Sequence, residues 1–495
     1  MTFGRRPNQW KPPRKLAGIL ASWGPTFVFK SFVICIAVIN VHTFHAAYGQ
    51  EQEGWNLVTE HQKEIGFHAR EGIDSQRENY RPLRKVFLGS RGKATKDTFS
   101  LHWNLKWSGN RNLSPSSSGK RPPDEIYYPR RRVLTNGTVL DQNQQFLVRE
   151  AYLQWLEEGW LLQTGAIRYG WGTADFVNPV SVVNPKDLRY GLSAEKDQQL
   201  LSTPSLRLTR LLDERSMTLV LIPLQESTLF PSAEHNWDLE LDNQRFRTQT
   251  IQDEKSRNVG SVALKYDVTI PSGDLSFIYY NGTDHELAVR PESLTIEDRR
   301  PLVINLKQLS VRKNSWGAAY QQTFDGIVLK AESLYTPDKT APKTFDRSRI
   351  ETLEFPLETM TTPHVASSFG FNYFLETRDF LGIKLSETIF TGEYFAQRFL
   401  KSGVLPGLTN EMIGANLRTG AMEDRLEVLA TFLYDRLLNG QGKLLKVTFA
   451  DDAIKHSLNL GQFDGPLPAG DAIGSAFYYF RSRDYAAYEL SYSLP

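Results

Sequence analysis

The sequence predicts an all-β fold, namely a transmembrane antiparallel β-barrel with long extracellular loops. This prediction rests on three observations. The chain of 495 residues is polar on average, yet 12% of its residues are aromatic. Many segments alternate between apolar and polar residues with a period of two. Short and long connections also alternate along the chain. A membrane barrel explains all three features, because its lumen and loops are polar while its outer surface and interfacial girdles are apolar and aromatic.

The composition excludes several other classes of protein. The 58 basic and 56 acidic residues leave a net charge of +2, so we expect no nucleic-acid partner. A bundle of transmembrane helices would need repeated apolar runs of about 20 residues, which the sequence lacks. The single cysteine, Cys35, lies in the N-terminal apolar run. A processed chain would therefore contain no disulfide and no thiolate metal site.

The N-terminal segment has the order of a secretory signal. Basic residues from Arg5 to Lys30 precede the apolar stretch 31–40, and small residues at Ala47 and Gly49 predict cleavage before Gln50. The remaining alternative is an uncleaved anchor or a buried helix. Residues 50–82 are polar without clear periodicity. The predicted organisation is a signal peptide at 1–49, a polar extension at 50–82 and the barrel at 83–495.

Period-two alternation marks the strands, as expected when one face is apolar. Over Phe99 to Trp107, the odd-numbered residues are apolar and the even-numbered residues are polar. The C-terminal segment from Tyr488 to Leu494 repeats this pattern, which is typical of the last strand that the barrel insertion machinery recognises. Further strand candidates between them are residues 205–212, 259–267, 274–280, 302–324, 326–335, 368–375, 382–390, 426–434, 443–450 and 456–462.

The connections between these strands alternate in length. Tight ones are expected at 157–159, 213–215, 271–273 and 325–326, and long polar ones at 108–145, 170–203, 223–258, 282–301 and 336–364. In outer-membrane barrels, short turns face the periplasm and long loops face the outside. The tally lies between about 14 and 18 strands, and we expect about 16, an even number. The range 302–324 is compatible with one protruding strand or with two.

One local succession carries a resemblance to a known family. A hairpin runs from Arg149 through the turn at Gly159 to Tyr169, followed by Trp171-Gly-Thr-Ala-Asp-Phe-Val-Asn-Pro179 and Val183-Asn-Pro-Lys-Asp-Leu-Arg189. This succession resembles an uncharacterised porin-like outer-membrane family of Proteobacteria, which has Trp-Gly-x-x-Asp followed by Asn-Pro-x-Asp-x-Arg. The resemblance is close over 149–212 and architectural elsewhere. It implies a porin-like channel for an unidentified small solute.

The long loop at 170–203 is the candidate constriction of such a channel. Asn178-Pro179 and Asn184-Pro185 are turn formers. If the loop folds into the lumen, its charged residues and those at its root are candidates to line the pore: Arg149, Glu150, Arg168, Asp175, Asp187 and Arg189. The competing interpretation is that these residues only hold the loop through internal salt bridges and turn hydrogen bonds.

No sequence motif predicts an enzyme. The chain has no Gly-x-Ser-x-Gly elbow, His-Glu-x-x-His helix, phosphate loop or dinucleotide fingerprint, so we expect no catalytic residues, cofactor or metal site. The leading hypothesis is an outer-membrane channel, with outer-membrane lipids as partners and a homo-oligomer left open. The alternatives are a barrel with an assembly, export or lipid-modifying role, and a secreted glycan-binding β-protein.

Overall fold

The structure is a computed structural model in which most of the chain after residue 61 is described. The predicted signal segment, the cleavage point at Gln50 and the candidate Arg189 lie outside the described residues. Those described are 62–72, 83–110, 133–134, 137–141, 144–187, 199–224, 228, 246–251, 260–285, 289–295, 302–309, 311–344, 358–376, 378–380, 383–404, 408–451, 453–466 and 484–494.

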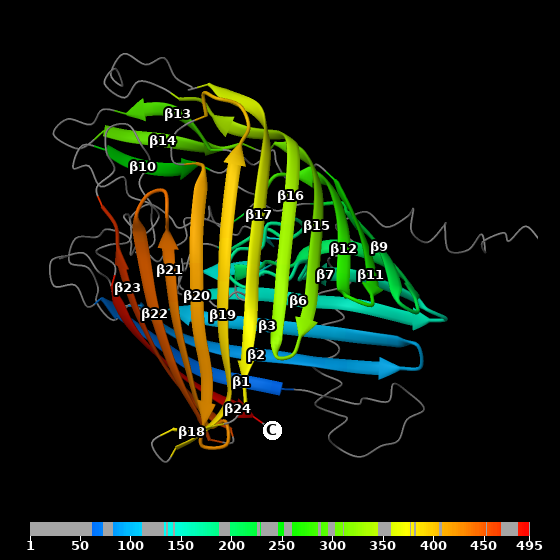
Figure 1. Cartoon of the computed structure of the whole chain (residues 1–495), viewed down its shortest axis with the longest axis vertical. Coiled ribbons are helices and arrows are strands. Elements are labelled where there is room, and N and C mark those ends of the chain that lie inside the picture. The colour runs from blue at the N-terminus through cyan, green and yellow to red at the C-terminus, as the bar shows by residue number, and fades with distance from the viewer. Residues whose placement is uncertain are drawn as a thin grey trace, which may run out of the picture. The chain divides into compact units, whose positions relative to one another are not determined.

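Antiparallel strands form one closed sheet (Figure 1). Its 21 strands include the short additions β4 (Val133–Leu134), β5 (Gly137–Asp141) and β18 (Arg378–Phe380), so the ring itself has 18. The first half of the ring is β1 (Gln62–Gly72), β2 (Leu83–Lys96), β3 (Phe99–Asn110), β6 (Gln144–Glu157), β7 (Trp160–Ile167), β8 (Thr203–Leu212), β9 (Arg215–Ile222), β11 (Ser261–Ile270) and β12 (Gly273–Thr283). The second half is β15 (Arg312–Phe324), β16 (Ile327–Pro342), β17 (Thr359–Leu375), β19 (Ile383–Phe399), β20 (Asn410–Ala421), β21 (Leu426–Asp435), β22 (Gly440–Asp451), β23 (Ile454–Asp464) and β24 (Tyr485–Leu494).

The first strand closes the ring and corrects the predicted organisation. β1 pairs with β2 on one side and with β24 on the other, from Lys63 opposite Leu494 to Gly72 opposite Tyr485. It lies inside the range predicted to be a polar extension, so the barrel begins before residue 83. Ile65 is exposed on the outer face, but Lys63 and Glu71 stand at sequence positions of the same parity and interrupt the apolar alternation. The expected number of about 16 strands, from a range of 14 to 18, was low by two, because β1, β2, β9 and β20 were not recognised; the 18 strands of the ring are the upper limit of that range.

The range 302–324 contains two strands, of which only one belongs to the ring. β14 (Leu302–Gln308) pairs with β10 (Phe246–Ile251) and β13 (Val289–Thr295) in a separate small sheet, whereas β15 enters the barrel. This sheet is built from two of the long connections. Among the described residues, no helix is long and apolar enough to cross a membrane.

Connections alternate in length around the ring as predicted. Tight turns at Glu158–Gly159 and Asp325–Gly326 have both residues at positive φ, between 30° and 83°. This is the geometry of the two-residue hairpin turns that match strand twist. β3 and β6, β7 and β8, β9 and β11, and β12 and β15 are joined by the long connections. Because the ring has an even number of strands, its first strand begins, and its last strand ends, on the side of the barrel that carries the short turns.

The alternation along β3 is explained by the two faces of the sheet. Ser100 and His102 face the lumen, where the His102 ring stacks on Tyr152 at 4.7 Å, while Phe99 is 52% exposed on the outer face. Exposed outer aromatic residues recur near the short turns, at Phe99, Trp160 and Phe324, and again about 26 Å further along β15 at Trp316. The outer surface is therefore apolar with two aromatic levels.

Candidate functional site: a loop inside the barrel

The connection between β7 and β8 comprises residues 168–202; its described residues 168–187 fold into the lumen, and one buried asparagine fixes the root of this loop. The Asn184 side chain accepts a hydrogen bond from the Tyr169 amide at 2.6 Å and donates to the carbonyl oxygens of Ile167 and Leu201 and to the Thr203 hydroxyl. Burial raises the pKa of Tyr169 to about 12, and its hydroxyl forms a 2.7 Å hydrogen bond with Ser205. The phenol is therefore neutral at physiological pH and ties the loop to β8.

One stretch of this loop packs on the inner wall of the barrel. Val180, Val182 and Val183 are at most 4% exposed and join an apolar cluster with inward residues of the wall strands. The wall contributes Val220 and Ile222 of β9, Ala263 of β11, Ile278 and Tyr280 of β12, Ala319 of β15 and Leu334 of β16. A methyl group added at Gly317 of β15 would lie 3.0 Å from Val180, which shows how closely loop and wall approach.

Backbone amides of the loop then bind two carboxylates on the far wall. Glu332 of β16 accepts hydrogen bonds from the amides of Thr173 and Ala174, the latter at 2.7 Å. Glu393 of β19 accepts three more, from Asp175, Phe176 and Val177, at 2.6 to 3.0 Å. Hydrogen bonds to an ionised acceptor are roughly twice as strong as neutral ones. These two carboxylates therefore hold the middle of the loop in place.

The loop crosses the full width of the ring. Its tip residue Phe176 lies against Gly414 of β20, where an added methyl group would be 2.5 Å from the ring, and it packs beside Met412. In the order of pairing, β20 is half-way round the 18-strand ring from β7, the strand that the loop leaves. A segment that starts on one wall and contacts the opposite wall must narrow the lumen.

The predicted charged residues fall into different environments. Arg168 and Glu150 form an ion pair of 3.2 Å at the root of the loop, and Asp175 forms one of 2.8 Å with Lys330 of β16. Asp187 is only 3% exposed, and its amide donates to the Gln199 carbonyl at 2.6 Å. Arg149 occupies the extra position where the pairing of β6 with β3 shifts. Asp175 thus pairs with the barrel wall.

Both predicted Asn-Pro turns are structural parts of this loop. Asn178 donates to the Trp171 carbonyl at 2.7 Å and lies against Gly172, whose φ of +94° requires glycine. Pro179 and Pro185 are buried. Of the two asparagines, Asn184 is the more deeply buried, at 1% exposure.

Sequence reasoning missed Lys330, Glu332 and Glu393, the wall residues that bind the loop. Lys330 and Glu332 lie on a predicted strand at positions of its polar face, so a lumen location could have been inferred. Their pairing with residues more than 150 positions earlier in the chain leaves no signal in a single sequence.

A basic stripe follows β2 and β3 on the lumen side. The register places Arg91, Lys93 and Lys106 there, with His102 opposite Lys93. Lys106 lies 3.8 Å from the centre of the inward Phe87 ring. Among the lumen-facing side chains that the structure describes on these two strands, none is a carboxylate.

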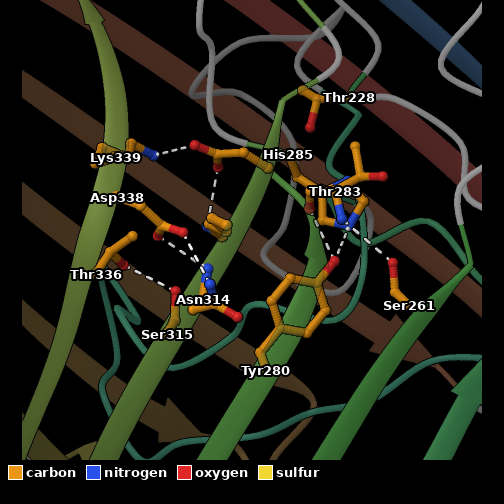
Figure 2. Close-up of polar contacts among 12 residues, drawn as sticks. Thr228, Ser261, Tyr280, Thr283, His285, Asn314, Ser315, Thr336, Asp338 and Lys339 are labelled. Atoms are coloured by element: carbon orange, nitrogen blue, oxygen red, sulfur yellow. Dashed lines mark hydrogen bonds and ion pairs between the residues drawn. The ribbon is translucent and has the colours of Figure 1, made fainter. Parts of the chain in front are cut away.

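A second polar cluster lies on the inner wall at the long-connection end of β12, β15 and β16 (Figure 2). Asp284 forms ion pairs with Lys313 at 2.9 Å and Lys339 at 2.8 Å, and all three side chains are at most 6% exposed. Beside them, the Tyr280 hydroxyl donates to the Thr283 carbonyl at 2.8 Å. This cluster attaches the start of the β12–β15 connection to the wall. Thr228, also labelled in Figure 2, accepts a hydrogen bond from the Lys186 amide of the constricting loop.

The described residues contain no group of three or more His, Cys, Asp or Glu side chains that could hold a metal ion. No family model matches the chain, and no curated protein matches it in sequence.

Solved structures of outer-membrane proteins are similar over most of the chain. A BenF-like porin from Pseudomonas fluorescens Pf-5 has 7% identity and a TM-score of 0.48, covering 89% of this chain and 100% of that one. OccK2 (OpdF) of Pseudomonas aeruginosa in complex with glucuronate has 8% identity and a TM-score of 0.46, with 89% and 99% coverage. OccAB1 of Acinetobacter baumannii has 7% identity and a TM-score of 0.46, with 90% and 99% coverage. All three TM-scores are below 0.5.

Proposed function

We propose that the protein is an outer-membrane channel whose passage is narrowed by residues 168–187. The observation that carries this proposal is the path of the loop, which leaves β7 and is held on the far wall by Glu332 and Glu393. A closed barrel with a charged lumen offers a polar route, and the loop inside it sets the width and the charge of that route.

The outer face supports a membrane setting. Large apolar side chains such as Leu153, Phe277 and Phe369 are 48%, 49% and 57% exposed on it. In water such a surface would be a strong aggregation liability. In a bilayer it matches the apolar band about 25 Å tall, flanked by aromatic girdles, that membrane barrels present.

Export is proposed from the N-terminal sequence. A basic lead, an apolar stretch and the small residues Ala47 and Gly49 predict removal of residues 1–49. N-terminal sequencing of protein purified from outer membranes should then begin at Gln50. A chain that begins at Met1, or that is recovered with cytosolic proteins, would contradict export.

We further propose that the channel prefers anions. Arg91, Lys93 and Lys106 line one wall without a carboxylate among the described lumen side chains of their strands. On the opposite side, Asp175 is paired with Lys330, and Glu332 and Glu393 accept loop amides. The described lumen side chains of β2 and β3 are therefore net positive, which raises the local concentration of anions beside this wall.

The test is the reversal potential of the purified protein in a planar bilayer under a KCl gradient. The wild type should pass chloride more readily than potassium, and the double variant R91Q/K93Q should shift the reversal potential toward zero. R312Q is the matched control, because Arg312 also bonds a neighbouring amide side chain, Asn281, but lies on the outer face. A cation-selective wild type, or equal shifts in the variant and the control, would contradict the proposed selectivity.

A further inference from the structure

A cluster of exposed cations lies on the outer face of the barrel, at the long-connection end of β19 to β22. Arg398 is near the end of β19, Glu411 near the start of β20, and Arg436 directly follows β21. Glu411 shares the outer face with Ile413, which is 41% exposed, whereas the adjacent Met412 packs inside the barrel. The cluster is therefore separate from the lumen.

The geometry leaves both guanidinium groups available to an external ligand. Arg398 Nη2 is 2.8 Å from Glu411 Oε1, and Arg436 Nη1 is 3.1 Å from Glu411 Oε2. The two arginine side chains are 66% and 62% exposed, while the carboxylate between them is 5% exposed. A guanidinium carries five N–H donors, so each arginine keeps donors that point away from the shared carboxylate.

The charge of this sector is positive. Lys443 is exposed on the outer face of β22, opposite Phe432 of β21, and its long stem can carry the ammonium group toward the rim. At this end of the strands, a described carboxylate of the outer face besides Glu411 is Asp464 at the end of β23, which lies 3.5 Å from the Gln441 amide nitrogen. We define the rim site as Arg398, Glu411, Arg436 and Lys443.

We propose that the rim site binds a phosphate group of an anionic lipid in the outer leaflet. The site lies where the exposed apolar side chains of the outer face, such as Tyr394 and Ile413, give way to the long connections. In a bilayer this is the level of the headgroups. Guanidinium forks match the geometry of phosphate, and paired arginines bind it in bidentate fashion. This inference rests on the proposed membrane setting but not on the constriction.

The experiment measures binding of lipid A with both phosphates, and of the same lipid after dephosphorylation, to the full folded chain by native mass spectrometry. The test variant is R398Q/E411Q/R436Q, which removes both guanidinium groups without leaving Glu411 unpaired. R312Q is the control, because Arg312 is an exposed outer-face arginine at the same end of the barrel in another sector. Resistance of the barrel to denaturation in detergent shows whether each variant has folded, and conductance in planar bilayers is recorded separately as the test of the channel function.

The wild type and R312Q should bind the phosphorylated lipid at least tenfold more tightly than the dephosphorylated one, and the triple variant should lose this preference. Equal binding of both lipids by the wild type would overturn the proposal, as would an unchanged preference in the triple variant. A different outcome is that the wild type forms a homo-oligomer and shows no lipid preference, while the triple variant is monomeric. The rim site would then be a contact between copies of the chain, and the proposal would be wrong. A chain that prefers the phosphorylated lipid but never conducts would contradict the channel function alone.

Discussion

A single buried side chain, Asn184, joins four groups at the root of the constricting loop. It bonds the backbone at Ile167, Tyr169 and Leu201 and the hydroxyl of Thr203. Both the end of β7 and the approach to β8 are held by this one amide. Pro185 follows it directly, and proline fixes the backbone where the loop turns.

Replacing Asn184 with alanine should therefore destabilise the folded protein by about 1–3 kcal/mol, because buried backbone groups lose their partners. The measurement is urea unfolding in lipid vesicles, followed by protease sensitivity of the loop in the folded protein. N178A is the control within the same loop, since the Asn178 side chain donates one hydrogen bond, to the Trp171 carbonyl. If the two variants lose the same stability, Asn184 is not the residue that fixes the root.

The assignment of the two faces of β3 leads to a second prediction for single residues. The register of β3 places Leu105 on the outer face and Asn104 toward the lumen, opposite Glu150. L105R should cost about 2–4 kcal/mol of folding free energy near the middle of the membrane, while N104R should be tolerated. A folding titration into lipid vesicles measures both variants, and equal losses would show that the faces of β3 are assigned wrongly.

As an element, the 168–202 loop shows what a single sequence predicts and what it does not. Its length and its two Asn-Pro turns predicted an ordered inserted loop, because proline and asparagine favour defined turns. Arg168 and Glu150, both candidates from the sequence, lie on one hairpin, and the structure joins them in an ion pair. It did not predict Asp187 as a buried residue or Lys330 as the partner of Asp175, because contacts across the lumen join strands that are distant in sequence.

The strands that the sequence missed share a physical cause. Lumen-facing positions of β1 and β2 carry charge, and a strand with charges on its inner face and Ala, Gly or Ser on part of its outer face lacks strong apolar alternation. β3 was recognised because Leu101, Trp103 and Leu105 occupy its outer face without interruption. Alternation is thus clearest where the outer residues are large.

The carboxylates of Glu332 and Glu393 hold the loop against the wall. Removing their charges should therefore make the loop more mobile while the loop itself remains in the chain. In E332Q/E393Q, five backbone amides lose an ionised acceptor, and the open channel should show larger current fluctuations and a higher mean conductance. D267N is the control, because Asp267 is a lumen carboxylate bound to Ser216, Ser276 and Lys265 of the wall and not to the loop. The same single-channel currents from the double variant and from the wild type would contradict this role of the two carboxylates.

At the scale of the whole molecule, the 18-strand ring explains why a polar chain can suit a membrane. Its inward positions carry most of the charge, and its outward positions expose apolar side chains. Closure through the pairing of β1 with β24 leaves no open sheet edge within the ring, as a bilayer requires. Such a ring is wide enough for an aqueous passage, so what fills its lumen decides how much passes.

The single-channel conductance of a variant lacking residues 174–193 tests the central claim most directly. The deletion removes the segment that reaches Glu393 and Phe176's contact with β20, while the strands of the ring remain. The account predicts a conductance well above that of the wild type in a barrel that still resists denaturation. An unchanged conductance in a folded variant would show that the loop does not narrow the passage.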